Sequence, residues 1–156
     1  MQKIIFILIF SILLNAKDTY TISYKNMTLG NIKDMRTIKN GYIVAIPSSS
    51  WLKFILGFDK YSFYQSNKKP SLNGKVKYTK DKFMILTVID KLSQNRQSQI
   101  IKNGKKILAI NCYGYKCKYI RTKVNSSKKY KGHIYYDKNN KLDEICDYES
   151  GICIEK

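Results

Sequence analysis

The 156-residue sequence predicts a mainly β fold, an antiparallel meander, small sandwich or open barrel with one short helix. Runs of alternating or β-branched residues are separated by turn signals. An Asn-Gly pair at 103–104 stands between two apolar runs, and all four cysteines lie in the last third of the chain. An α+β fold is the alternative, because one apolar run fits a helix as well as a strand.

Two strands are expected in the N-terminal half. Residues 18–24 alternate with a period of two, which places Tyr20, Ile22 and Tyr24 on one face, and a Lys-Asn turn follows. Residues 42–46 form a β-branched apolar run between an Asn-Gly turn and a proline. This pattern is typical of a buried strand.

A short helix is expected over residues 51–56. Three serines precede it and can cap its first turn, and Gly57 ends it. The segment is short, lacks a polar face and carries the only tryptophan, so we expect a core helix that covers a sheet. The alternative is an interfacial membrane element, with Trp51, Phe54 and Phe58 among lipids.

Two central segments are less regular. Residues 66–74 have the composition of an exposed loop, which is either a hinge or lid or a plain connection. Residues 83–89 form a strong apolar run whose β-branched content favours a central strand. A helix that reaches Leu92 is the alternative.

From about residue 98 the pattern predicts successive hairpins. The Asn-Gly turn at 103–104 joins a first pair of strands, because this dipeptide adopts the positive φ angles of a two-residue turn. Further strands are expected at 115–124, 133–137 and 142–148, with a basic loop at 125–131. The C-terminal part, 98–156, is therefore expected to be an antiparallel meander held by disulfides.

The four cysteines predict two disulfides, because an even number in an exported chain is typical of a disulfide framework. The spacing favours Cys112 with Cys117 and Cys146 with Cys153, since each pair brackets a hairpin turn. A pairing between the hairpins is the alternative and would constrain the unfolded chain more strongly. The spacing does not fit a structural zinc site, and we expect neither metal nor cofactor.

The first residues predict export. A basic start is followed by an apolar run at 4–14 that is shorter than the roughly 20 residues of a membrane span. We expect residues 1–16 to be a signal peptide cleaved after Ala16, and residues 17–156 to form one domain without a transmembrane anchor. The expected location is the periplasm or the extracellular space.

The formal net charge of +18 predicts an anionic partner: a glycan, lipid headgroups, nucleic acid or an acidic protein. Nearly all the positive charge is lysine, which favours loose, salt-sensitive attraction over bidentate contacts. The alternative is that the charge only reflects a DNA composition rich in A and T, which would make Lys, Asn, Ile and Tyr abundant, as they are here, without selection for binding. In that case the protein is structural and has no specific ligand.

One strand carries the expected binding surface. Counting by two places Tyr115, Tyr119, Arg121 and Lys123 on one face, together with Cys117. Aromatic rings beside cations can stack on sugars or bases while they hold anionic groups. We expect this surface to be extended by Lys128, Lys129, Tyr130 and Lys131; the alternative is tyrosine packing between strands with solvated lysines.

The single histidine limits the catalytic possibilities. His133 with Asp137 and Arg121 is the best catalytic group available, and it would suit a small secreted hydrolase of the nuclease type. Nothing distinguishes these residues from an ordinary hairpin surface. A non-catalytic binding protein of the cell envelope is therefore the expected function, with the hydrolase as the alternative.

Overall fold

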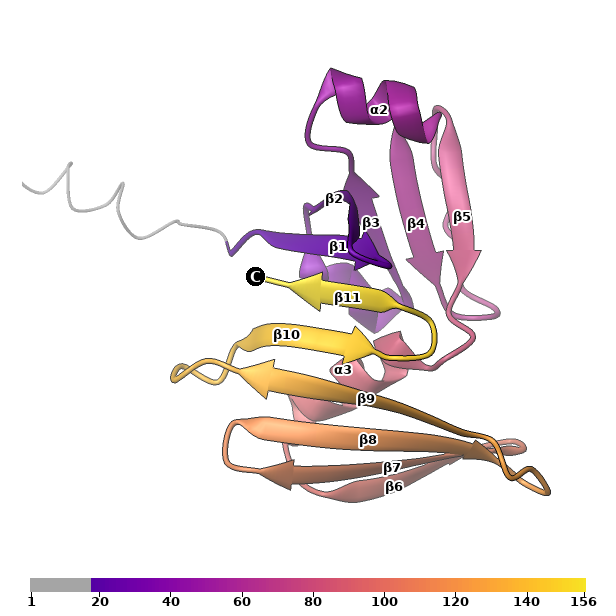
Figure 1. Cartoon of the computed structure of the whole chain (residues 1–156), viewed down its shortest axis with the longest axis vertical. Coiled ribbons are helices and arrows are strands. Elements are labelled where there is room, and N and C mark those ends of the chain that lie inside the picture. The colour runs from indigo at the N-terminus through magenta and orange to yellow at the C-terminus, as the bar shows by residue number, and fades with distance from the viewer. Residues whose placement is uncertain (1–17) are drawn as a thin grey trace, which may run out of the picture.

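The computed structural model describes residues 18–156, so the expected signal peptide and its cleavage site lie outside the described residues. These residues form one open, mixed sheet of 11 strands in the order β5-β4-β3-β2-β1-β11-β10-β9-β8-β7-β6 (Figure 1). The predicted mainly β class is confirmed. Figure 1 shows the sheet curving around a helix, α3.

The N-terminal half runs from the middle of the sheet to one edge. Its first four strands are antiparallel, and the fifth, β5, lies parallel to β4 at the edge. The predicted strands at 18–24 and 42–46 are present as β1 and β3. The elements are β1 Tyr20–Tyr24, β2 Met27–Ile32, the 3-10 helix η1 Met35–Asn40, β3 Tyr42–Ile46, α2 Ser50–Leu56, β4 Lys60–Tyr64 and β5 Val76–Lys80.

The C-terminal half starts at the opposite edge and returns to the middle. Every neighbouring pair in it is antiparallel, and β11 closes the sheet by pairing with β1. The predicted hairpins are present, but residues 129–131, expected in a basic loop, belong to a strand. The elements are α3 Ile85–Gln94, β6 Gln99–Asn103, β7 Lys106–Tyr113, β8 Lys116–Lys123, β9 Lys129–Tyr136, β10 Leu142–Asp147 and β11 Ile152–Glu155.

The prediction of a central strand at 83–89 is wrong, because this apolar segment forms the start of helix α3 from Ile85 onward. Its apolar residues recur at intervals of three and four, which forms one buried stripe. The Asp81 carboxylate accepts the backbone N–H groups of Phe83, Ile85 and Leu86 and so satisfies the start of the helix. The buried stripe consists of Ile85, Leu86, Val88, Ile89 and Leu92.

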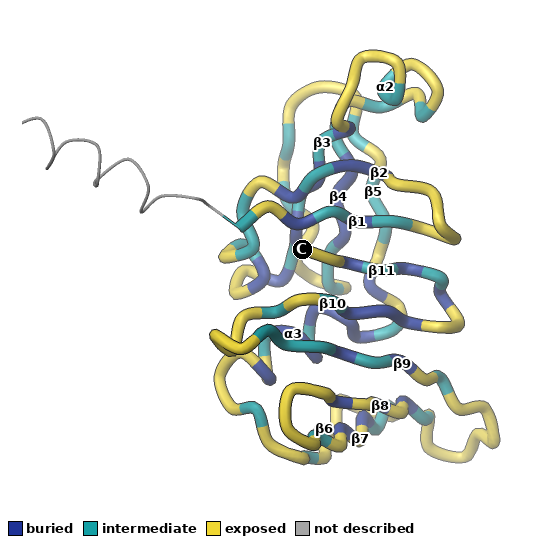
Figure 2. Tube along the Cα trace, turned by 60° about the vertical axis from the view of Figure 1, so that its left-hand side comes forward, coloured by how far each residue is buried: buried dark blue, intermediate teal, exposed yellow. Residues whose placement is uncertain are grey.

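Helix α2 ends at the predicted residue and begins one residue earlier than predicted, but its environment differs from the prediction. Ser49 Oγ accepts the N–H of Leu52, and Gly57 ends the helix in the left-handed conformation. None of its seven residues is buried, and Figure 2 shows it projecting beyond the ends of β3 and β4. The core-helix expectation is wrong because α3 supplies the buried apolar stripe. In the part of the chain that is described, no helix has the length and apolar character needed to cross a bilayer.

Both disulfides are local, as the spacing favoured. Cys112 bonds Cys117 and Cys146 bonds Cys153, and each pair occupies directly opposed positions of neighbouring strands. All four cysteines are therefore paired. Two disulfides indicate a non-cytoplasmic, oxidising environment.

Tyr119 fills the inner face where β8 meets β9. Its ring lies against Gly132, where an added Cβ would come within 2.3 Å of the ring and 2.5 Å of the Cys146 carbonyl oxygen. The Tyr119 hydroxyl donates a 2.9 Å hydrogen bond to Asp147, which also accepts the Ser150 N–H in the β10–β11 turn. Tyr119 and Asp147 are each 1% exposed, so this bond lies away from water.

We predict that Tyr119→Phe lowers the free energy of unfolding by about 1–3 kcal/mol, because it leaves a buried carboxylate oxygen without its donor. The matched control is Tyr113→Phe, which deletes the same hydroxyl from a side chain that is 92% exposed. Urea unfolding of both variants measures the difference. Equal stabilities would contradict a buried Tyr119–Asp147 bond.

Candidate functional site

The predicted binding stripe on β8 faces the core for half of its length. Cys117, Tyr119 and Arg121 are buried, with Tyr119 at 1% and Arg121 at 8% exposure. The expectation that this face is exposed is therefore wrong at these three positions. Tyr119 cannot offer its ring to a ligand while Gly132 and Asp147 hold it in the core.

Arg121 has a structural environment. Its guanidinium lies 4.1 Å from the centroid of Tyr130 and 4.9 Å from that of Phe83. Nη1 donates a 2.8 Å hydrogen bond to the carbonyl oxygen of Lys82, just before α3. Arg121 and Tyr130 therefore join β8 and β9 to the start of α3, and neither is free to form the predicted surface.

The other predicted binding residues are separated along β8 and β9. Tyr115 lies in the β7–β8 turn, where the Arg96 guanidinium is 5.4 Å from its ring centroid. Lys123 is exposed at the far end of β8, near the exposed Lys128 and Lys129. Lys131 is exposed on β9. The structure thus places Lys123, Lys128 and Lys129 at one end of β8 and β9, Tyr115 at the other end and Lys131 between them.

The outer face of the same strands carries a compact aromatic cluster. His133 and Tyr135 on β9 have ring centroids 4.4 Å apart, and Tyr148 lies 5.4 Å from His133. His133 Nδ1 lies 2.8 Å from the Tyr148 hydroxyl. Partial burial raises the pKa of Tyr148, so at neutral pH its hydroxyl keeps its proton and can donate to Nδ1.

Three lysines on β8 and β9 lie beside this cluster. The Lys116 ammonium lies 5.4 Å from the Tyr135 centroid, and Lys118 is directly opposite His133 across β8 and β9. Lys131 accepts the Tyr148 backbone N–H at its carbonyl and exposes its side chain. We call these six residues the outer platform: Lys116, Lys118, Lys131, His133, Tyr135 and Tyr148.

Two acidic side chains border the outer platform: Glu149, whose carboxylate accepts the backbone N–H of Lys131 at 2.8 Å, and Glu144. Glu144 Oε1 lies 3.2 Å from His133 Nε2, at an angle outside that of a hydrogen bond. It also lies 3.2 Å from Cys146 Sγ, but a disulfide sulfur carries no proton to donate. Glu144 is the negative charge nearest to His133, so it opposes the binding of an anion there.

The same residues do not form a metal site. His133, Glu144 and Cys146 place donor atoms within 4.8 Å of one another. Cys146 is bonded to Cys153, so its sulfur is not a thiolate and only two ligands remain. Structural zinc needs four.

The predicted catalytic group is not assembled. Arg121 lies on the inner face, whereas His133 lies on the outer face. The Asp137 carboxylate accepts the N–H groups of Asn139 and Lys141 and pairs with Lys156 at 3.2 Å. These N–H bonds and Lys156 keep the pKa of Asp137 low, which suits a structural turn. His133 contacts Glu144 and Tyr148 instead.

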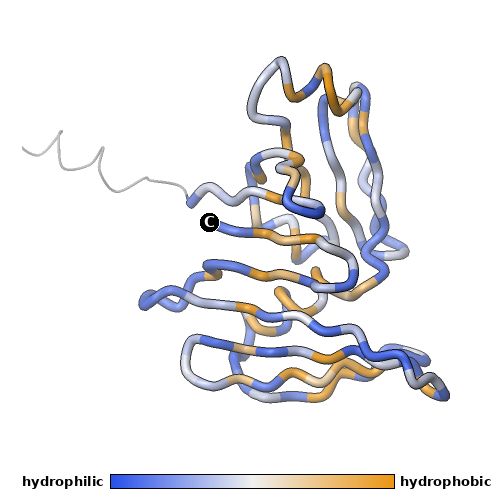
Figure 3. The backbone as a smooth tube through the Cα atoms, viewed as in Figure 1, coloured by the Kyte–Doolittle hydropathy of each residue, from blue (hydrophilic) through white to orange (hydrophobic). Residues whose placement is uncertain are grey.

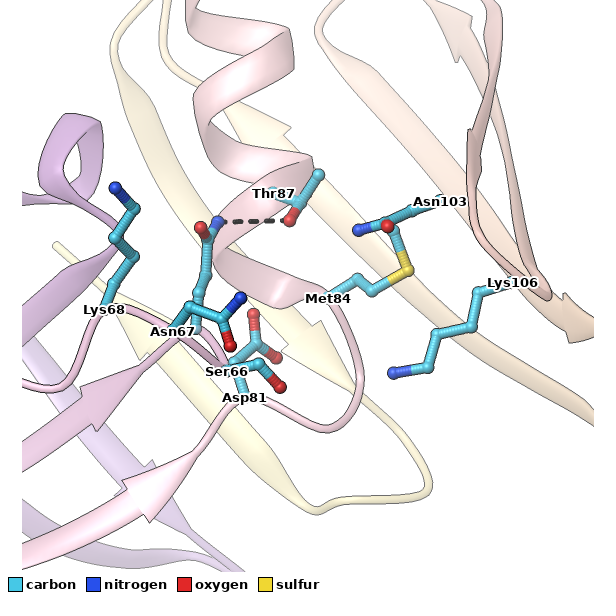
Figure 4. Close-up of a pocket in the computed structure, with 9 residues that line it drawn as sticks. Ser66, Asn67, Lys68, Asp81, Met84, Thr87, Asn103 and Lys106 are labelled. Atoms are coloured by element: carbon cyan, nitrogen blue, oxygen red, sulfur yellow. Dashed lines mark hydrogen bonds between the residues drawn. The ribbon is translucent and has the colours of Figure 1, made fainter.

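A polar pocket of about 340 Å³ lies between α3, the loop after β4 and the β6–β7 hairpin. Figure 4 shows Asp81, Lys106, Thr87 and Asn103 among its lining residues. Ser66, Asn67 and Lys68 of the expected hinge or lid also line it, and that role stays a prediction.

The pocket has unusual electrostatics. Burial raises the pKa of Asp81 to about 6, against the opposing effect of three backbone N–H donors and of Lys106. Burial lowers the pKa of Lys106, and repulsion from the Arg121 guanidinium lowers it further. Because the Asp81 oxygens already accept the first N–H groups of α3, their clearest role is to hold the helix in place.

No protein-family model, curated protein or solved structure matches this chain.

Sequence reasoning missed Lys116, Lys118, Tyr135 and Tyr148 as one surface. One signal was available: Lys116 and Lys118 alternate with Cys117 and Tyr119, and lysine is almost never fully buried without a partner. The cluster itself could not be found from spacing. Its rings come from β9 and from the β10–β11 turn, which only strand pairing brings together.

We predict that the protein loses stability as the pH rises from about 4 to about 6. The folded-state pKa of Asp81 is about 6 against 3.8 for an unperturbed aspartate, so the folded chain holds the proton over this window and the unfolded chain does not. The contribution of protonated Asp81 to the free energy of unfolding is complete below pH 4 and lost above pH 6. The total change is on the order of 3 kcal/mol.

Urea unfolding from pH 3.5 to 7.5 measures this effect as the difference between the native protein and Asp81→Asn. The asparagine cannot ionise, so its profile is expected to lack the decrease. Parallel profiles across the whole window would show that Asp81 titrates normally.

Proposed function

We propose that the protein is a non-catalytic binding protein that holds anionic polymers on the outer platform. The observation that carries this proposal is the cluster of His133, Tyr135 and Tyr148 with three lysines beside it. The polymers that fit are those whose units combine a negative charge with a flat ring or sugar face: anionic glycans and single-stranded nucleic acids.

The mechanism has two parts. The large positive net charge, +18 for the full chain, attracts a polyanion over a distance of about one Debye length, roughly 8–10 Å, which favours encounter without choosing a site. Tyr135 and Tyr148 then stack on rings of the polymer, while Lys116, Lys118 and Lys131 neutralise its charges. The exposed lysines at 123, 128 and 129 would extend the path of the polymer along the sheet.

We further propose that the protein is exported, loses residues 1–16 and works in the periplasm or the extracellular space as part of the cell envelope. The basic and apolar leader supports this location. The two disulfides also support it, because such bonds persist in oxidising compartments.

We predict that Lys116→Gln with Lys118→Gln weakens binding to heparin or to oligo-dT roughly tenfold, because two neutralising charges are lost. The matched control is Lys33→Gln with Lys39→Gln, the same charge change at two exposed lysines around η1. Fluorescence anisotropy at several salt concentrations measures both. Binding that is insensitive to salt would contradict the proposal, and so would equal weakening by the two double variants. The heparin and oligo-dT arms distinguish a glycan from a nucleic acid.

A small secreted hydrolase is the second candidate, because His133 lies between Glu144 and Tyr148. Glu144→Gln separates the two functions. If the protein is a binder, removing this negative charge tightens polyanion binding two- to fivefold, or about 0.5–1 kcal/mol. If it is a hydrolase, the same change abolishes the turnover of a cleaved polymer. Turnover is followed by gel analysis of the labelled substrates.

A further inference from the structure

Helix α2 presents apolar side chains to solvent at one extremity of the molecule. Figure 3 shows hydrophobic residues in α2, beyond the ends of the strands that it connects. Trp51 is 69% exposed, Phe54 is 82% exposed and Ile55 is 53% exposed. The rings of Trp51 and Phe54 stack with centroids 6.5 Å apart, one helical turn from each other. They form one continuous apolar surface.

This surface is held rigidly. Ser49 caps the start of α2 and Gly57 closes its end, so the backbone is fixed at both termini. Leu56 and Phe58 pack against the core, and the Phe58 ring lies 6.0 Å from that of Tyr61 on β4. The helix is therefore attached by one side, and its largest apolar side chains point away from the protein.

The immediate surroundings of α2 are basic. Lys60 at the start of β4 and Lys75 just before β5 lie at the end of these strands that adjoins α2, together with one acidic residue, Asp59. Asp59 accepts the Lys75 backbone N–H, and Lys53 lies within the helix itself. Exposed apolar side chains next to lysines are complementary to a surface in which anionic groups cover an apolar layer.

We propose that α2 is a membrane-interface anchor that inserts Trp51, Phe54 and Ile55 among the lipids of an anionic bilayer while nearby lysines contact the headgroups. Interfacial elements combine these features: tryptophan and phenylalanine on one side and basic residues around them. A protein partner fits less well, because three side chains offer far less than the ~800 Å² that each partner of a stable complex buries. This site is separate from the outer platform and goes beyond the proposed function.

Trp51 is the only tryptophan of the chain and therefore reports directly on the proposed insertion. The protein beginning at Lys17 contains all the described strands and helices and excludes the apolar run at 4–14, which would itself bind lipid. It is mixed with vesicles of phosphatidylcholine containing phosphatidylglycerol, and with vesicles of phosphatidylcholine alone. We expect a shift of Trp51 emission to shorter wavelength and quenching by lipids brominated in the acyl chain, both with the anionic vesicles.

The variant Phe54→Ser with Ile55→Ser keeps Trp51 as the reporter and is expected to reduce vesicle affinity at least roughly tenfold, since two of the apolar side chains that would insert into the bilayer are lost. The matched control, Ile100→Ser with Tyr113→Ser, removes two other exposed apolar side chains and should bind as the native protein does. The variant at Lys116 and Lys118 should also insert normally, which separates this proposal from the outer platform.

Vesicle binding without quenching of Trp51 would overturn the anchor and leave only electrostatic adsorption. An unchanged affinity in the Phe54 and Ile55 variant would overturn it as well. A dimer that dissociates in this variant, seen by light scattering in the absence of lipid, would show instead that α2 binds a second copy of the chain. Quenching of the native protein requires no variant, so the proposal stays testable if a variant fails to fold.

Discussion

The packing of α3 against one face of the sheet is the constraint on which the other features depend. The chain crosses from the edge strand β5 to the opposite edge strand β6 through this helix, and its buried stripe completes the core. The strand residues that face α3 are thereby removed from solvent, which leaves the opposite sheet face for the proposed outer platform. Asp81 secures this arrangement because its carboxylate satisfies the backbone at the start of α3.

The pairing of β1 with β11 makes the two halves of the chain one sheet. Each half is a set of sequentially paired strands that could bury only part of its apolar surface alone, and the β1–β11 pair makes their inner faces continuous. Ile22 and Ile154 are opposed in this pair and fully buried, as are Ile145 and Ile134 on the next strands. The disulfide Cys146–Cys153 lies one residue along the same strands and binds the C-terminal strand to β10.

The two proposed surfaces differ in the way they use positive charge. On the outer platform, lysines and aromatic rings alternate within a few ångströms, which suits a polymer that carries charges and rings at short intervals. At α2 the exposed apolar side chains project from the protein and lysines lie next to them, which suits a bilayer whose anionic headgroups cover apolar acyl chains. A general excess of lysine explains neither arrangement, because composition does not determine where aromatic rings gather.

Local signals in the sequence determined the strands around the Asn-Gly turns, both ends of α2 and both disulfide pairs. Turns, caps and hairpin disulfides depend on residues close together in the chain, so spacing alone contains the information. Residues 83–89 could not be assigned in this way, because a short apolar run fits both a buried strand and a buried helix until the carboxylate that caps it is known. Only the tertiary structure decided which face of β8 is buried and that α2 is exposed. Both depend on what covers the sheet, and that contact joins segments far apart in the chain.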